Sequence, residues 1–338
     1  MKLGDVYLVF DKYMDFSTKS PARNERTTSH RLYQLTYISP LPSQNSVLNV
    51  HQNKKQLIEV IIRSLPDEID ISRDVGLKLI VTGQNHIPIQ ISAGGLVISR
   101  QDLQNFHEEA DEIVVAQAIY AATVEAKHEQ VVADDTDIYI MLLFHYHMNS
   151  VETPMTLTPT RCGRSVIDIK ATERQLGDMC VDVLPAHALT GCDQVPMLHG
   201  IGKLTMLKTL KEHEHSLSLL GDLSANFEDV VSQATKFIGS CYGIHNAISM
   251  TDVRVKTWIK RLGERLPPKC PNCHHYPQLQ RPSEKMSREL TYKALFGRQL
   301  LEIHHALTHV TLVGRRLRKL EHSSPLDSPH QHSLLLTI

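Results

Sequence analysis

Leu189-Thr190-Gly191-Cys192-Asp193 places a carboxylate directly after a glycine-containing turn, and Gly200-Ile201-Gly202-Lys203 begins seven residues after that aspartate. The second turn opens a helical pattern that starts at Leu204. Backbone N–H groups in such a turn, at the N-terminus of a helix, can hold a phosphate. A carboxylate beside a phosphate site indicates a bridging divalent cation. An ordinary turn between two helices is the alternative for the glycine-rich segment.

Two acidic clusters upstream extend this pattern. Glu108-Glu109-Ala110-Asp111 lies within a long helical pattern over Gln101–Lys127, and Asp134-Asp135-Thr136-Asp137 follows a short predicted strand. Neighbouring carboxylates raise each other's pKa unless a cation neutralises them, so the second cluster favours a metal. The alternatives are structural, because acidic residues complement the dipole of a helix's first turn, and Asp134 or Asp135 can cap the next helix.

A third carboxylate follows the apolar run Val6-Tyr7-Leu8-Val9-Phe10, which is typical of a strand buried on both faces. The run ends in Asp11. Open α/β sheets bind ligands at the carboxyl ends of their parallel strands, so Asp11 is a candidate ligand. The alternative is an aspartate that ends the strand and begins a turn.

The order E-A-D, then an apolar strand with D-x-D, then G-x-D-x6-G-I-G-K resembles the flap endonuclease (XPG-type) nucleases. The motif series HEEAD…DTD…LPAHALTGCD…GIGK more closely resembles a little-characterised, often transposon-associated group of eukaryotic proteins that share the same core domain. The resemblance covers residues 6–210, with an insert at 24–100. It implies an α/β, PIN-like (flap endonuclease-like) fold with a mostly parallel sheet flanked by helices.

Two departures from the family pattern affect this expectation. The family has an earlier strand with another metal-binding aspartate, for which the chain, beginning at Met1, has no room before Val6, and it usually has glycine where this chain has Lys12. The chain is therefore expected to be N-terminally truncated. A missing central strand would leave an edge of the sheet exposed.

The resemblance implies metal-dependent, structure-specific hydrolysis of phosphodiester bonds in DNA or RNA, with DNA favoured. Two Mg²⁺ or Mn²⁺ ions would activate water and stabilise the leaving oxygen. Their implied ligands, which would also be the catalytic residues, are Asp11, Glu109, Asp111, Asp135, Asp137 and Asp193, and the implied phosphate-binding residues are Gly200, Gly202 and Lys203. The alternatives are a catalytically inactive, truncated or transposon-derived module that binds nucleic acid or protein, and a degenerate remnant without function.

Local patterns predict the remaining elements and the domain limits. The expected elements are a helix over Lys54–Leu65 ended by Pro66, a strand over Leu77–Thr82, a hairpin over Ile87–Ile98, a strand at Gln130–Ala133, a strand over Ser165–Lys170, and helices over 172–180, Phe227–Phe237 and Thr251–Leu262. The expected domains are a PIN-like domain over 1–210, a helical extension over 211–268, and an irregular tail over 269–338 that is disordered from His322.

Composition limits the cofactors and partners. Cys270 and Cys273 have the spacing of half a zinc site, but a second half is not evident, so a polar turn with free thiols is favoured over zinc. The net charge of −1 is not the global signature of a nucleic-acid binder, although an acidic metal site would offset a basic face. No signal peptide or apolar run of ~20 residues is present, so we expect an intracellular, nuclear protein outside the membrane.

Overall fold

The computed structural model of the chain describes residues 4–13, 31–68, 76–192, 197–212, 217–222, 224–265 and 331–337, with the backbone alone at 125, 261–265 and 331–337. Asp193, Cys270 and Cys273 lie outside the described residues. The contacts divide the chain into two compact units, Met1–Gln175 with Arg316–Ile338, and Leu176–Arg315. The predicted domain limit after residue 210 therefore falls inside the second unit.

The first unit is built on one mixed sheet. Its strands are β1 (Asp5–Val9), β2 (Lys78–Thr82), β3 (Ile89–Ser92), β4 (Leu96–Ser99), β5 (Ala126–Val132), β6 (Met155–Thr158), β7 (Ile167–Asp168) and β8 (Gln331–Thr337), in the order β4-β3-β2-β1-β8-β5-β6-β7. Strands β2, β1, β8, β5 and β6 run parallel, and antiparallel pairs lie at both ends. The predicted α/β class is confirmed.

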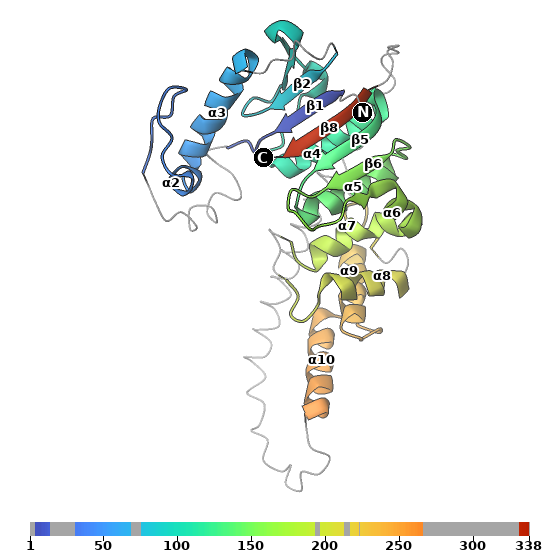
Figure 1. The fold of residues 1–338 in the computed structure, drawn as a ribbon. Helices are drawn as coiled ribbons and strands as arrows, with labels where there is room; N and C mark the ends of the chain where they lie inside the picture. Colours follow the sequence, from blue (N-terminus) through green and yellow to red (C-terminus); the bar gives the residue numbers. More distant parts are fainter. Residues whose placement is uncertain are drawn as a thin grey trace. The chain divides into compact units, whose positions relative to one another are not determined.

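The C-terminal strand occupies the centre of this sheet (Figure 1). Strand β8 pairs in parallel with β1 on one side and with β5 on the other. The expectation of an irregular, disordered tail is wrong for residues 331–337. The expected exposed edge beside β1 is also absent, because β8 supplies the backbone hydrogen-bonding groups that a preceding strand would have supplied.

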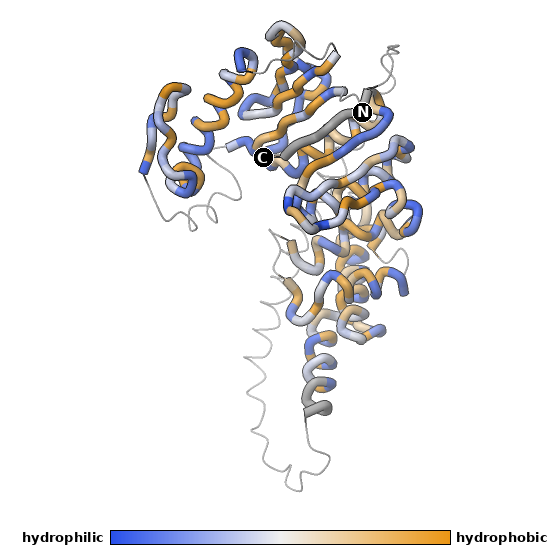
Figure 2. The backbone as a smooth tube through the Cα atoms, viewed as in Figure 1, coloured by the Kyte–Doolittle hydropathy of each residue, from blue (hydrophilic) through white to orange (hydrophobic). Residues whose placement is uncertain are grey.

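The first unit also contains helices, some of which cover the two faces of the sheet. They are α2 (Gln44–Leu48), α3 (His51–Glu68), α4 (Ala110–Tyr120), α5 (Thr136–Met148) and α6 (Ile169–Leu176). Ile58 of α3 packs with Leu79 and Val81 of β2. On the opposite face, Gln117 of α4 donates to Thr82 Oγ1 at 2.6 Å. Figure 2 shows apolar residues along β1, β2 and α3, as burial between layers requires.

Three elements in the N-terminal half test the predictions made from local pattern. The predicted strand over Leu77–Thr82 and hairpin over Ile87–Ile98 are confirmed as β2 and as β3 with β4. The predicted end of the helix at Pro66 is wrong, because α3 continues to Glu68. Pro66 lies two residues before the end of α3, so the hydrogen bond that its missing N–H would have made is lost only in the last turn.

The long helix predicted over Gln101–Lys127 is shorter than expected. A 3₁₀ turn at Gln101–Leu103 is followed by non-helical residues, α4 starts at Ala110, and a π-helical turn at Ala121–Glu125 leads into β5 at Ala126. Tertiary contacts hold the segment before Ala110 outside the helix. The Lys12 N–H donates to Glu108 O at 2.8 Å, which fixes this segment beside the end of β1.

The strand predicted over Ser165–Lys170 is also shorter than expected. Strand β7 contains Ile167 and Asp168 alone, and α6 begins at Ile169. Asp168 explains the change, because its Oδ1 accepts from the Ala171 N–H at 2.8 Å and so satisfies a free donor in the first turn of α6.

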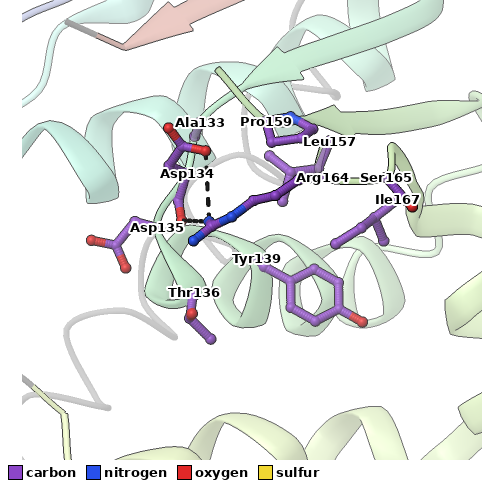
Figure 3. Close-up of a pocket in the computed structure, with 10 residues that line it drawn as sticks. All are labelled: Ala133, Asp134, Asp135, Thr136, Tyr139, Leu157, Pro159, Arg164, Ser165 and Ile167. Carbon is purple, nitrogen blue, oxygen red and sulfur yellow. Dashed lines mark hydrogen bonds and ion pairs between the residues drawn. The ribbon is translucent and has the colours of Figure 1, made fainter. Parts of the chain in front are cut away.

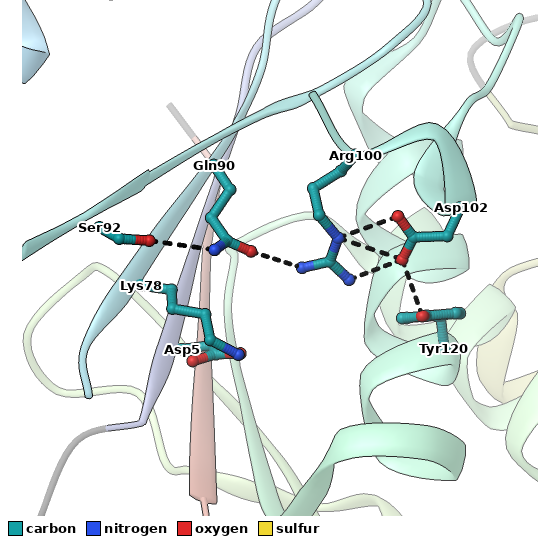
Figure 4. A network of polar contacts seen from close by, with 7 residues as sticks. All are labelled: Asp5, Lys78, Gln90, Ser92, Arg100, Asp102 and Tyr120. Atoms are coloured by element: carbon teal, nitrogen blue, oxygen red, sulfur yellow. Dashed lines mark hydrogen bonds and ion pairs between the residues drawn. The ribbon is translucent and has the colours of Figure 1, made fainter. Parts of the chain in front are cut away.

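A polar network ties the outer hairpin to α4 (Figure 4). The Arg100 guanidinium, in a residue only 8% exposed, donates to Gln90 Oε1 at 3.0 Å and to both oxygens of Asp102. Tyr120 at the end of α4 donates to Asp102 Oδ2 at 2.9 Å. Burial opposes ionisation of Asp102, but the hydrogen bonds and charge of Arg100 outweigh it and hold the pKa of that carboxyl below its ordinary value.

The second unit is helical in its described part. Its helices are α7 (Cys180–Leu189), α8 (Lys203–Glu212), α9 (Phe227–Cys241) and α10 (Met250–Arg265), with a 3₁₀ turn at Gly177–Met179 before α7. Helices α9 and α10 confirm the predicted helices over Phe227–Phe237 and Thr251–Leu262. Across the described residues of the whole chain, no helix is both long and apolar enough to cross a membrane.

Candidate functional site

The direction of the chain reverses in the middle of the sheet. From β1 the chain passes through α3 to β2, and from β5 it passes through α5 to β6 on the opposite side. Such a topological switch point is where open α/β sheets bind ligands, outside the carboxyl ends of the strands. Strand β8 lies between β1 and β5, so the carboxyl ends of these two strands are about 10 Å apart, twice the usual strand spacing.

The predicted acidic residues of the first unit lie at the ends of these strands and at the starts of the helices beside them. Asp11 follows β1, and Glu109 and Asp111 flank the first residue of α4. Asp135 lies between β5 and α5, and Asp137 lies in the first turn of α5. We call these five residues the switch-point carboxylates.

Asp11 joins the end of β1 to the start of α4. Its Oδ1 accepts from the Ala110 N–H at 2.9 Å, so its carboxylate lies at the positive end of the α4 dipole. Gln84 Nε2 donates to the backbone oxygen of Asp11 at 3.0 Å, and Gln84 Oε1 accepts from the Tyr13 N–H at 2.9 Å. Because Ala110 stands between Glu109 and Asp111, this one bond brings the backbones of three switch-point carboxylates together.

Lys12 holds the segment before α4 from inside. The residue is 1% exposed, and its Nζ donates to the backbone oxygen of Asn105 at 2.9 Å and also to the Asn105 side-chain oxygen. Burial lowers the pKa of the Lys12 amine to about 8. Its contacts with Asn105, which local pattern did not indicate, were missed from the sequence.

Glu109 and Asp111 have the positions of a helix N-terminus. Glu109 is the N-cap residue of α4 and its side chain makes no capping hydrogen bond, while Asp111 and Glu112 lie in the first turn. Glu112 Oε2 is paired with His107 Nδ1 at 2.7 Å. The structural alternative, in which these acids complement the helix dipole, therefore describes their placement. Carboxylate oxygens are also the ligands that a divalent cation such as Mg²⁺ prefers.

The second acidic cluster caps α5. Asp135 is the N-cap residue and accepts from the Asp137 N–H at 2.9 Å, which confirms the alternative that an aspartate of this cluster caps the next helix. Asp134 contacts Thr160 and the guanidinium groups of Arg161 and Arg164. The hydrogen bond from Thr160, followed by the two arginines, holds the pKa of the Asp134 carboxyl below its ordinary value.

The side chains do not form a ready-made metal centre in the part of the chain that the structure describes. Within those residues, no three or more His, Cys, Asp or Glu side chains are grouped so that they could hold a metal ion. The carboxylate chemistry suits Mg²⁺ or Mn²⁺, which prefer oxygen ligands, but the described residues do not bring together the ligands that such an ion requires.

The predicted phosphate-binding turn belongs to the second unit. Gly200 has a φ of 77°, and Lys203 is the first residue of α8. The Lys203 Nζ donates to three oxygens at the C-terminal end of α7, at 3.0 Å to His187 O, 3.2 Å to Thr190 Oγ1 and 2.6 Å to Gly191 O. A phosphate at this turn would compete with these acceptors for the Lys203 amine.

Gly191 is required by the conformation of the turn after α7. Its φ is 109°, and a Cβ added to it would lie 2.7 Å from Met197 Cα. We therefore expect Gly191→Ala to destabilise the second unit by about 2 kcal/mol, measured by urea unfolding. Gly202→Ala is the matched control, because a Cβ there meets no atom within 4 Å. Equal unfolding midpoints for the two variants would contradict the prediction.

Searches with this chain against protein-family models, curated proteins and solved structures found no match. The function is therefore inferred from the chemistry of the switch-point carboxylates and from their position at the ends of the strands.

Proposed function

We propose that the chain is a metal-dependent, structure-specific nuclease with a PIN-like, flap endonuclease-like fold, acting in the nucleus on phosphodiester bonds of DNA in preference to RNA. One observation carries the proposal. Acidic residues from the end of β1, the start of α4 and the start of α5 lie at the carboxyl ends of the strands that form the switch point. The motifs E-A-D, D-x-D and G-x-D with G-I-G-K support it in their order along the chain.

Each group would have a distinct role in this activity. Asp11, Glu109, Asp111, Asp135, Asp137 and Asp193 would hold Mg²⁺ or Mn²⁺. The bound ions would lower the pKa of a water molecule and stabilise the leaving oxygen. Lys12 and Gln84 would keep Asp11 and the start of α4 in place through the contacts described above. The backbone at Gly200–Gly202 and the Lys203 amine would bind a phosphate of the nucleic acid.

A second function, binding of nucleic acid or protein without catalysis, is favoured by a different observation. Asp135 is used as a helix cap, Lys203 is bonded to α7, and the described side chains form no group of three metal ligands. A chain that kept the fold but no longer bound a divalent cation would have these features.

The experiment that tests the proposal is calorimetric titration of the whole chain with Mn²⁺, beside the double variant Asp135→Asn, Asp137→Asn. Asparagine also caps helices, so the variant should keep the start of α5. We expect Mn²⁺ affinity to fall at least tenfold in the variant, together with cleavage of flap and hairpin DNA.

The matched control is Glu228→Gln, Asp229→Asn, which removes an equal pair of acidic residues from the first turn of α9. This control should bind Mn²⁺ and cleave DNA as the natural chain does. A folded natural chain that binds no Mn²⁺ would contradict the enzyme proposal. If that chain still binds DNA, the non-catalytic function would be supported.

A further inference from the structure

A pocket of about 140 Å³ lies beside the switch-point carboxylates, at the carboxyl ends of β5 and β6 (Figure 3). Its walls are mainly apolar and come from Ala133, Leu157, Pro159, Ile167 and the ring of Tyr139. The pocket is smaller than the roughly 300–1,000 Å³ typical of sites for drug-sized ligands, so its occupant is a single small ring system or a fragment of similar size.

The rim of the pocket carries both donors and acceptors. Arg164 extends across it, and its Nη1 donates to the Asp134 backbone oxygen at 3.4 Å and lies 3.7 Å from Asp134 Oδ1 (Figure 3). Asp134 Oδ1 is buried and accepts no hydrogen bond from the described residues. Ser165 and Thr136 add hydroxyl groups. A flat ligand with amino and carbonyl groups on its edge could bond to this rim.

The charges on the rim indicate which part of a nucleotide, the phosphate or the base, the pocket would bind. Asp134 and Asp135 both line the pocket, whereas Arg164 is the one cationic side chain among its lining residues. A phosphate group would be repelled by the two carboxylates. A nucleobase is uncharged and planar, and it can stack on an aromatic ring or on an arginine plane.

We propose that this pocket binds one unpaired nucleobase of a single-stranded segment, with Tyr139 and Arg164 as the contacting side chains. That the ligand is nucleic acid rests on the proposed function. The inference adds that the part bound in this pocket is a base. A base within a duplex has its faces stacked and its pairing edge occupied, so the ligand is a single strand, flap or loop. The neighbouring backbone phosphates then lie outside the pocket.

The test is fluorescence anisotropy of the whole chain in EDTA, with a labelled single-stranded dC oligonucleotide and the same backbone made of abasic nucleotides. Stacking of a base on an aromatic side chain contributes about 1–3 kcal/mol, so we expect the natural chain to bind the dC strand about tenfold more tightly. Tyr139→Leu and Arg164→Gln should each reduce this preference, without weakening binding of the abasic strand.

Arg161→Gln is the matched control, because Arg161 pairs with Asp134 at 3.9 Å but does not line the pocket. It should keep the full preference for the base. Tyr139→Phe, which retains the ring, should also keep it and so separates loss of stacking from loss of folding.

Three outcomes separate this inference from the proposed function. Equal affinity for the two strands, or a preference that survives in both Tyr139→Leu and Arg164→Gln, overturns the pocket and leaves the hydrolytic activity standing. A preference lost in these variants, in a chain that cleaves no DNA with Mn²⁺, supports the pocket and overturns the activity. Failure to bind either strand in EDTA overturns the pocket, and failure to bind with Mn²⁺ present overturns the nucleic-acid ligand as well.

Discussion

Removal of residues 331–338 is expected to unfold the first unit. Strand β8 pairs with β1 through Leu334–Thr337 and with β5 through Gln331–Leu336. Without it, backbone groups on both neighbours lose their partners in the centre of the sheet. Each buried donor or acceptor left unsatisfied costs about 1–3 kcal/mol. Because β8 pairs at several positions on each side, these costs together reach the roughly 5–15 kcal/mol by which a domain is stable.

The measurement is urea unfolding followed by circular dichroism, on the whole chain and on the shortened chain. We expect the cooperative transition of the first unit to be lost in the shortened chain and restored by a synthetic peptide of residues 331–337. A peptide with Leu335→Pro is the control, because proline lacks the N–H that a central strand must donate. An unchanged midpoint in the shortened chain would show that β8 does not stabilise the sheet.

The position of β8 was not predictable from local pattern. Leu334-Leu335-Leu336 is a short apolar run in a tail rich in serine, proline and histidine, and three residues are too few to distinguish a strand from a loop. Its partners, β1 and β5, lie hundreds of residues earlier in the chain. By contrast, β2 and the hairpin of β3 with β4 were predicted correctly, because alternation and a Gly94-Gly95 turn specify them locally.

The start of α4 shows how tertiary contacts limit a helical pattern. The sequence around residues 101–127 has helical spacing throughout, yet α4 occupies 110–120 alone. Asp11 bonds to the N–H of Ala110, and Lys12 bonds to Glu108 and Asn105, so the segment before Ala110 is held by residues from the other end of the first unit. No local spacing contains that information.

The candidate site was predictable at the level of elements but not of atoms. The placement of Asp11 after β1 and of Asp135 after β5 follows from strands that end in carboxylates, which the sequence displays. Whether a carboxylate then faces a cation, caps a helix or pairs with arginine depends on side-chain geometry. Asp135 caps α5 and Asp134 pairs with Arg164, and these choices depend on loops whose paths the sequence pattern does not specify.

Lys12 is expected to make the stability of the first unit depend on pH in the alkaline range. Burial lowers the pKa of its amine from 10.5 to about 8 in the folded chain. Between these two values the unfolded chain binds a proton that the folded chain has released, so the free energy of unfolding rises with pH. A shift of this size corresponds to a rise of about 3 kcal/mol across the window.

The measurement is the free energy of unfolding at pH 7.5 and at pH 10, for the natural chain and for Lys12→Met. Methionine keeps a long side chain without a titrating group, so we expect the natural chain to gain stability relative to Lys12→Met as the pH rises. Lys236→Met removes an exposed lysine of α9 and should follow the natural chain. If Lys12→Met shows the same rise as the natural chain, another group titrates, and the Lys12 amine is not the buried base that holds the segment before α4.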